Sequence, residues 1–258
     1  MWDWYNRYYE ATRDSRAYAA FCARVFGRNF AQHGFSDMAQ VDRLIEVLAL
    51  APGNRVLELG CGNGAMAAYI SNATGAHITG IDFIPEAIRQ AQVRTQGKKD
   101  RLAFEVGDIG HLAFAPGSFD ALIAVDTLYF TDLDTTVAQM KALLAPGGQM
   151  GIFYAYGADP ENPLATFPRE NLPPERTPLG VALRNHGLAF RAWDFTADDY
   201  RHAQLKKRVI EEVHADIEAE GNIFLYENRR GEAEGVMAAI EAGAHARYLY
   251  HVLVAATA

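Results

Sequence analysis

Five short apolar runs recur between residues 55 and 154, and stretches with helical periodicity or polar character separate them. The runs, which are rich in branched side chains, occupy residues 55–59, 77–81, 102–106, 121–125 and 149–154. Strands of continuous apolar character that alternate with helices form parallel sheets whose two faces are both covered. The alternation therefore predicts a doubly wound α/β fold.

Further elements are predicted on both sides of this alternating region. Before it, residues 38–48 follow helical spacing, and Asp37 is a candidate N-cap for that helix. After it, the proline-rich residues 157–178 predict a long loop. The remaining expected elements are a helix at 179–185, a strand at 188–195, an amphipathic helix through 205–217 and a last apolar strand at 248–254.

The composition restricts partners and location. The formal net charge is −8, whereas a protein that mainly binds nucleic acid normally presents a basic face, so we expect no nucleic-acid partner. No stretch approaches the roughly 20 apolar residues of a membrane span, and the aromatic, acidic residues 1–5 do not resemble a signal peptide. Cys22 and Cys61 are expected to be free thiols in a cytoplasmic protein. No histidines have metal-ligand spacing, so no metal site is predicted.

A glycine-rich loop follows the first apolar run directly. Gly60, Gly62 and Gly64 stand between that run and the start of a predicted helix. Glycine permits backbone angles that other residues avoid, and it lets a ligand touch the main chain. The loop therefore lies at the carboxyl end of the first strand, where sheets of this kind bind their ligands.

The residues of this loop leave two interpretations of the ligand open. Residues 60–65 also satisfy the dinucleotide pattern G-x-G-x-x-A, with Asp82 near the expected ribose-binding distance, as in a nicotinamide oxidoreductase. Three features argue against that interpretation. Glu58 lies inside an apolar strand end, where a carboxylate needs a partner. The loop has an additional glycine at Gly64, and a second acidic residue, Asp108, follows the third strand.

Four motifs in this order resemble the class I S-adenosylmethionine (SAM)-dependent methyltransferases. They are E-x-G-x-G-x-G at residues 58–64, an acidic residue that ends the second strand, GD at 107–108 and LAPGG at 144–148. The resemblance covers about residues 38–154. More locally, the pattern of residues is similar to that of the subgroup that acts on small metabolites. It implies a Rossmann-like, seven-stranded and mostly parallel sheet, in which the final strand is antiparallel.

The resemblance also implies how SAM would be bound at the first two strands. The loop of Gly60, Cys61 and Gly62 would pack against the methionine part of SAM, with Cys61 as a small filler. Glu58 would support the loop and the amino group of the methionine. Asp82 would accept both ribose hydroxyls, a geometry for which a carboxylate is well suited.

The third and fourth strands would complete this implied site. Phe83, directly after the ribose-binding position, would lie against the adenine. Asp108 would bond the adenine amino group, with the backbone of Ile109 beside it. Val125 and Asp126 would lie near the methionine amino group or the reacting centre.

Three side chains are candidates for the catalytic machinery. Tyr129 is expected either to line the acceptor pocket or to be a packing aromatic. Asp126 is either a base near the reacting centre or a cap of the helix after Thr131. His33 either contacts the acceptor as a general base or is an ordinary surface or core histidine. The aromatic residues 2–9 are expected to pack on the core or to form a mobile lid.

We therefore expect a SAM-dependent transfer of a methyl group to an N, O or C nucleophile of a small-molecule acceptor. The expected organisation is a helical N-terminal lid at 1–50, a SAM-binding core at 51–196, a helical cap insertion at 197–245 and a final core strand at 246–258. A lyase or cyclase that uses SAM in the same fold stays open, as do a nicotinamide oxidoreductase and a non-catalytic SAM sensor. The protein is expected to be a monomer or a homodimer.

Overall fold

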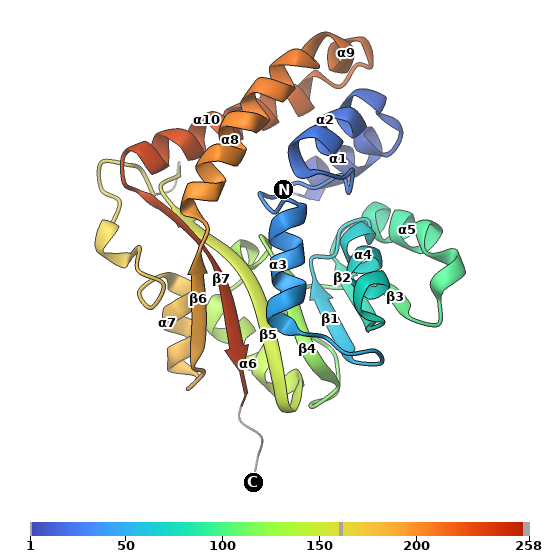
Figure 1. Cartoon of the computed structure of the whole chain (residues 1–258), viewed down its shortest axis with the longest axis vertical. Helices are drawn as coiled ribbons and strands as arrows, with labels where there is room; N and C mark the ends of the chain where they lie inside the picture. The colour runs from blue at the N-terminus through green and yellow to red at the C-terminus, as the bar shows by residue number, and fades with distance from the viewer. Residues whose placement is uncertain (1, 160–161, 255–258) are drawn as a thin grey trace.

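A mixed sheet of seven strands forms the centre of the computed structural model, which describes residues 2–159 and 162–254 (Figure 1). The strand order is β3-β2-β1-β4-β5-β7-β6. The strands are β1 (Arg55–Leu59), β2 (His77–Asp82), β3 (Leu102–Val106), β4 (Phe119–Val125), β5 (Leu144–Gly157), β6 (Phe190–Asp194) and β7 (His245–Leu253). The first five strands run parallel, and β7 is antiparallel to both β5 and β6. The predicted Rossmann-like, doubly wound, seven-stranded fold is confirmed.

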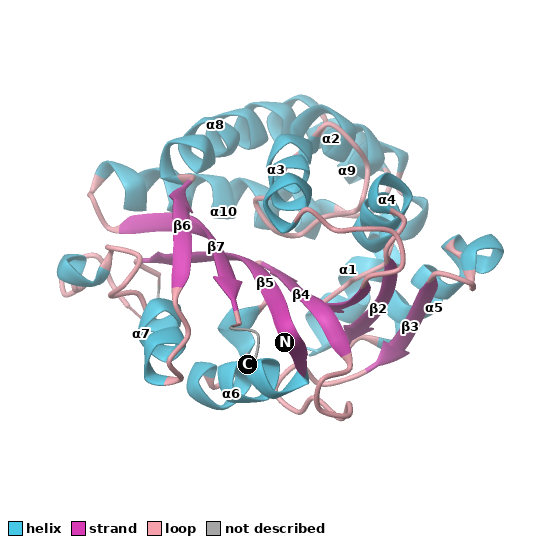
Figure 2. Ribbon diagram, turned by 60° about the horizontal axis from the view of Figure 1, so that its bottom comes forward, coloured by secondary structure: helices cyan, strands magenta, loops and turns pink. Residues whose placement is uncertain are grey.

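Helices cover both faces of the sheet (Figure 2). On one face, α3 (Met38–Leu48), α4 (Ala65–Thr74) and α5 (Pro85–Arg94) share an apolar core with the strands. On the other, α6 (Leu133–Leu143) and α7 (Pro178–Asn185) share a second core. As predicted, Asp37 caps α3, because its Oδ1 accepts a hydrogen bond of 2.9 Å from the Gln40 amide.

The order of the strands reverses beside β1, and this reversal positions the ligand crevice. β1 pairs in parallel with β2 on one side and with β4 on the other, whereas the chain reaches β4 only after β3. The connections after β1 and β4 therefore leave in opposite directions at the carboxyl edge of the sheet. Open α/β sheets bind ligands at such a switch point.

Five further helices form a layer above this edge. They are α1 (Trp2–Asp14), α2 (Arg16–Phe26), α8 (Thr196–Glu212), α9 (His214–Ala219) and α10 (Ile223–Glu241). The two ends of the chain thus supply one layer, in which α1 and α2 lie beside α8 and α9 (Figure 1). An apolar cluster that includes Tyr18, Phe21, Ile210 and Leu225 holds these helices together. We call these five helices the helical layer.

Some predicted boundaries differ from the structure. β5 begins at Leu144 instead of residue 149, and β7 begins at His245 instead of residue 248. Residues 255–258 of the expected last segment lie outside the described residues. Cys22 and Cys61 are both buried and free within the described chain. None of the described helices has the length and apolar character that crossing a bilayer would require.

Candidate functional site

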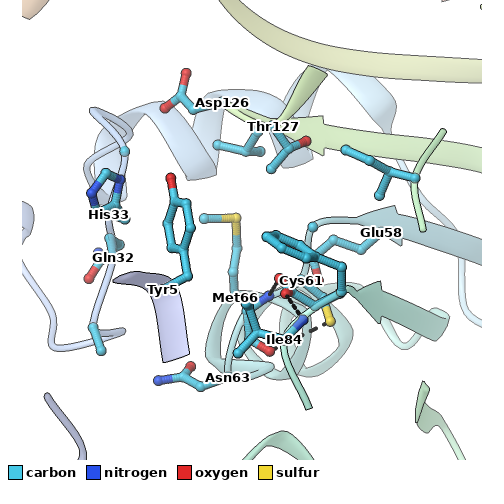
Figure 3. A pocket seen from close by; sticks show the side chains of 18 of the residues that line it. Tyr5, Gln32, His33, Glu58, Cys61, Asn63, Met66, Ile84, Asp126 and Thr127 are labelled. Atoms are coloured by element: carbon cyan, nitrogen blue, oxygen red, sulfur yellow. Dashed lines mark hydrogen bonds between the residues drawn. The ribbon is translucent and has the colours of Figure 1, made fainter. Parts of the chain in front are cut away.

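A cavity of about 370 Å³ lies at the carboxyl ends of β1, β2 and β4, with α1 forming part of its wall (Figure 3). All nine residues predicted to bind the cofactor line this cavity: Glu58, Gly60, Cys61, Gly62, Asp82, Phe83, Asp108, Ile109 and Val125. Two of the three catalytic candidates, His33 and Asp126, line it as well. A volume in this range is typical of a site for a small organic ligand.

The glycine loop is fixed by neighbours on three sides. The amides of Gly60 and Cys61 both donate to the Ile81 carbonyl, at 2.8 and 2.9 Å. Gly60 has a φ of 72° and Gly62 one of 55°, in the left-handed region that glycine adopts readily. A Cβ at Gly60 would lie 2.3 Å from Thr127 Cγ2, and one at Gly62 would lie 2.7 Å from Tyr9 Oη. Glycine is therefore required here by space as well as by backbone angle.

Asp82 connects the end of β2 to this loop. Its Oδ2 accepts from the Gly62 amide at 2.9 Å, and its Oδ1 accepts from the Ile84 amide at 3.0 Å. Burial raises the pKa of Asp82, and these backbone hydrogen bonds oppose that rise. Each carboxylate oxygen has two lone pairs, so Asp82 can hold the loop and still accept hydrogen bonds from a ligand.

Glu58 is buried at the end of β1, where only 4% of its surface is exposed. Burial, together with the charge of Asp82, raises its pKa to about 8. Its Oε2 has no hydrogen-bond partner among the described residues. A buried carboxylate without a partner is costly, and a cationic ligand group would relieve that cost. The arrangement therefore fits an ammonium group.

The third strand contributes a more open part of the wall. Asp108 is exposed, and its Oδ1 accepts from the Gly110 amide at 2.8 Å. Ile109 and Phe83 are half-buried beside it. The Phe83 ring meets the Tyr5 ring edge-on, with centroids 6.2 Å apart. This part of the cavity thus offers apolar rings and a carboxylate at its margin.

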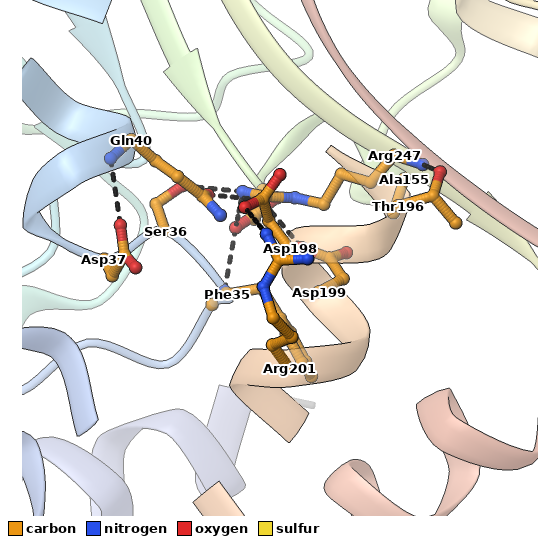
Figure 4. Close-up of polar contacts among 12 residues, drawn as sticks. Phe35, Ser36, Asp37, Gln40, Ala155, Thr196, Asp198, Asp199, Arg201 and Arg247 are labelled. Atoms are coloured by element: carbon orange, nitrogen blue, oxygen red, sulfur yellow. Dashed lines mark hydrogen bonds and ion pairs between the residues drawn. The ribbon is translucent and has the colours of Figure 1, made fainter. Parts of the chain in front are cut away.

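Asp126 lines the cavity and at the same time forms an ion pair with the buried Arg247. Its carboxylate binds Arg247 through Nε at 3.0 Å and Nη2 at 2.9 Å, and it accepts from the Phe35 amide at 3.0 Å. Arg247 also reaches Asp199, Gln40 and Ser36 (Figure 4). Because both of its oxygens are engaged by a permanent cation, Asp126 is poorly suited to act as a base.

The helix after Thr131 has a different cap from the one expected. Asp132, not Asp126, is the N-cap of α6, since its Oδ1 accepts from the Thr135 amide at 2.8 Å. Asp126 instead has a φ of 54°, an unusual value for a residue other than glycine.

Tyr129 does not belong to the cavity wall. Residues Leu128–Phe130 form a 3₁₀ turn, and adjacent side chains of such a turn point in different directions. The Tyr129 hydroxyl accepts from the Ala155 amide at 2.9 Å, and its ring stacks on Tyr154 at 5.1 Å. Phe130 lines the cavity instead. Tyr129 thus packs outside the residues that line this cavity, and we do not assign it a catalytic role.

His33 lies among the aromatic rings of α1. Its ring centroid is 5.0 Å from that of Trp4, 5.2 Å from Tyr5 and 5.3 Å from Tyr8. Burial, followed by the charges of Arg229 and Lys206, lowers the pKa of His33 well below its usual value. Its imidazole is therefore neutral at physiological pH and only weakly basic.

Several residues that line the cavity were not predicted to be site residues, although residues 2–9 were expected to pack on the core or to form a lid. Thr127 packs on Gly60 and donates to the Leu59 carbonyl at 3.1 Å. Tyr5 and Tyr9 enter from α1, and Gln32 and Ser36 enter from the segment before α3. Tyr5 and Tyr9 are four residues apart on one helix face, a spacing that predicts a shared surface but does not say what it covers.

Known proteins resemble this chain in both sequence and fold. A family model described as a methyltransferase domain matches residues 56–148. Methyltransferase GfsG of Streptomyces halstedii is 34% identical over 114 residues, which are 43% of this chain and 41% of the relative. The chain thus spans less than half the length of that curated relative.

Two solved structures share the fold at low sequence identity. Phosphoethanolamine N-methyltransferase 2 of Haemonchus contortus, in complex with phosphomonomethylethanolamine and S-adenosylhomocysteine, has a TM-score of 0.68 and 18% identity. The match covers 92% of this chain and 57% of that one. The cyclase SpnF has a TM-score of 0.65 and 22% identity, over 85% of this chain and 81% of its own. At such identities the likeness establishes the fold alone.

Proposed function

Because this chain contains the domain of the class I SAM-dependent methyltransferases, we propose that it transfers the methyl group of SAM to a small-molecule acceptor. The observation that carries the proposal is Glu58, a buried carboxylate without a partner beside a glycine loop. The methionine part of SAM carries an ammonium group, which is the cationic partner that this carboxylate lacks. The fold neighbour that binds S-adenosylhomocysteine supports the proposal.

The described residues fit SAM in the following roles. Glu58 binds the ammonium group, and the backbone of Gly60–Gly62 lies against the methionine chain. Asp82, already fixed by two backbone amides, accepts hydrogen bonds from the ribose hydroxyls. Phe83 packs against the adenine.

The remaining cofactor contacts come from the ends of β3 and β4. Asp108 accepts a hydrogen bond from the adenine amino group, and Ile109 lies beside it. Val125 closes the cavity next to the reacting centre. When bound, SAM supplies a methyl group on a sulfonium that is already activated, so the protein mainly aligns the acceptor and excludes water.

The organisation around the cavity suits a site that closes over its ligands. We propose that residues 1–50 and 197–245 act as a lid and cap over a core formed by 51–196 and the final strand. Tyr5 and Tyr9 of α1 already form part of the wall. The net charge of −8 favours a small-molecule acceptor over a nucleic acid, and the two free cysteines favour the cytoplasm.

Calorimetric titration with SAM tests this function. Asp82→Asn and Glu58→Gln should each weaken SAM binding by on the order of tenfold, the scale of one hydrogen bond to a charged group. Glu105→Gln, an exposed position on β3, is the matched control and should leave the affinity unchanged. Unaltered affinity in folded Asp82→Asn and Glu58→Gln variants, or tight binding of NAD(H) in place of SAM, would contradict the proposal.

The cofactor motifs alone do not distinguish methyl transfer from an intramolecular displacement or elimination on SAM, so product analysis is necessary as well. The proposal predicts that SAM incubated with the protein alone stays intact, and that S-adenosylhomocysteine forms only when an acceptor is added. Formation of 5′-methylthioadenosine from SAM alone would instead indicate a lyase or cyclase.

A further inference from the structure

The wall of the cavity opposite Glu58 includes residues 32–34, whose carbonyl groups all bind the helical layer (Figure 3). The Gln32 carbonyl accepts from the Tyr8 hydroxyl at 2.9 Å. The His33 carbonyl accepts from Arg229 at 3.0 Å, and the Gly34 carbonyl accepts from Lys206 at 3.3 Å. Three successive carbonyls therefore point away from the cavity.

The N–H groups of the same peptides point the other way. The described peptide bonds are all trans, and in a trans peptide the C=O and N–H groups are antiparallel. The Phe35 N–H confirms this direction, because it donates to Asp126, a cavity residue. The N–H groups of His33 and Gly34 meet no acceptor within residues 2–159 and 162–254. Both residues line the cavity, so these donors are available to a ligand.

Two buried cations lie behind this wall. The side chains of Lys206 and Arg229 are completely buried and share the single carboxylate of Glu232, at 2.7 and 3.2 Å. Burial lowers the pKa of Lys206 to about 8, which still leaves it mostly protonated at neutral pH. Lys206 and Arg229 each donate directly to one of these carbonyls, which polarises the peptide and strengthens its N–H group as a hydrogen-bond donor. The wall therefore favours a negatively charged ligand atom.

The surroundings of these N–H groups limit what that ligand can be. Tyr5 and Phe130 line the same cavity, and their rings meet edge-on at 6.0 Å. Phe130 is 44% exposed, so it presents apolar surface at the cavity margin. Arg247 pairs with Asp126, the carboxylate on this side, at 2.9 Å, and it also binds Asp199 at 3.1 Å. An aromatic ring with an anionic substituent matches both features.

We propose, on the basis of the proposed methyl transfer, that the acceptor is an aromatic oxyanion, a carboxylate or phenolate held by the His33 and Gly34 N–H groups. An oxygen lone pair forms the new bond to the methyl carbon while the carbon–sulfur bond breaks and its electron pair stays on sulfur. The two opposite charges cancel and no proton is transferred. The neutral, weakly basic His33 is consistent with an acceptor that is already deprotonated.

Benzoate and its neutral analogue benzamide are suitable probes, titrated calorimetrically into the protein of residues 1–258 saturated with S-adenosylhomocysteine. Benzoate should bind on the order of tenfold more tightly than benzamide. This is the scale expected for one charge interaction in a buried site that solvent still partly screens. Lys206→Met should weaken the binding of benzoate by a similar factor without changing the affinity for SAM. Lys207→Met is the matched control, because Lys207 is partly exposed and pairs with Glu234 on the surface at 2.9 Å.

Glu232→Gln provides a test with the opposite sign. Removing the shared carboxylate increases the positive charge behind the wall, so benzoate should bind more tightly, an effect that misfolding cannot imitate. Equal affinity for benzoate and benzamide, or benzoate binding that Glu232→Gln weakens or leaves unchanged, would overturn the inference. These results would leave the proposed function intact as long as SAM still binds. With SAM, a methyl ester from benzoate or a methyl ether from 4-nitrophenol identifies which oxyanion reacts.

Discussion

Glu58 lowers the stability of the ligand-free protein because it is a buried carboxylate without a partner. Its pKa of about 8 in the folded state lies above the ordinary value of 4.5. Between these two values the folded chain holds a proton that the unfolded chain has lost. The free energy of unfolding therefore falls as pH rises from 4.5 to 8, and the penalty is constant above that window.

Glu58→Gln should remove this penalty. Without ligand, the variant should match the wild type near pH 4.5 and become more stable than it as pH rises, by a few kcal/mol at pH 8. Urea denaturation at a series of pH values measures the difference. Glu105→Gln, at an exposed position, serves as the control and should show no such trend. A constant difference between Glu58→Gln and wild type across the window would contradict the burial argument.

At the scale of elements, the glycine loop and α1 depend on each other. The Tyr9 hydroxyl occupies the space that a side chain at Gly62 would need. α1 is in turn attached to α5, where Gln90 donates to the Tyr9 carbonyl at 2.9 Å. A change in the loop should therefore be transmitted to the helix above it.

Substitution of two glycines separates backbone strain from this contact. Gly62→Ala and Gly53→Ala both place alanine at a positive φ, of 55° and 83°, which costs about 1–2 kcal/mol. Only Gly62 has a neighbour in the way, since a Cβ at Gly53 would meet nothing within 4 Å. Gly62→Ala should therefore lose more unfolding free energy, and Tyr9→Phe should restore part of the difference. Equal losses at the two sites would show that the Tyr9 contact is unimportant.

The elements that the sequence predicted well are those whose pattern is local. The runs at residues 55–59 and 102–106 coincide with β1 and β3, because each is mostly apolar and is bounded by turn residues. The start of β7 was missed because His245 and Arg247 interrupt the apolar run. Arg247 is nevertheless buried there, since Asp126 and Asp199, distant in sequence, compensate its charge.

In the candidate site, too, the residues with a local sequence pattern could be predicted, and those that depend on distant residues could not. The residues of the glycine loop and the acidic strand ends could be predicted to converge, because parallel strands bring their carboxyl ends to one edge. The roles of Tyr129 and Asp126 could not, because they depend on a turn direction and on Arg247 of the last strand. Of the wall formed by residues 32–34, the sequence pointed only to His33, because the cations that bind this segment lie far away in the sequence, on α8 and α10.

For the whole molecule, Arg247 is the residue that joins the separate layers. It binds Asp126 after β4, Gln40 of α3, Asp199 of α8 and Ser36 in the segment before α3 (Figure 4). Its guanidinium also lies 4.6 Å from the centre of the Phe153 ring. The sheet, the helical layer and the cavity wall therefore meet at one buried cation.

Arg247→Met should destabilise the whole chain, because it leaves two buried carboxylates without their cation. The expected loss in unfolding free energy is about 3–5 kcal/mol, as for removal of one partner from a buried ion pair. Arg55→Met is the matched control, since Arg55 pairs with Asp120 on the surface at 2.8 Å and should lose at most about 1 kcal/mol. Urea unfolding measures both, and similar losses would rule out a joining role for Arg247.

A crystal structure of this protein with bound S-adenosylhomocysteine tests the central claim most directly. The account predicts the ligand in the cavity, with its amino group on Glu58, its ribose hydroxyls on Asp82 and its adenine between Phe83 and Asp108. A nucleoside bound elsewhere, or these carboxylates without contact to the ligand, would contradict it.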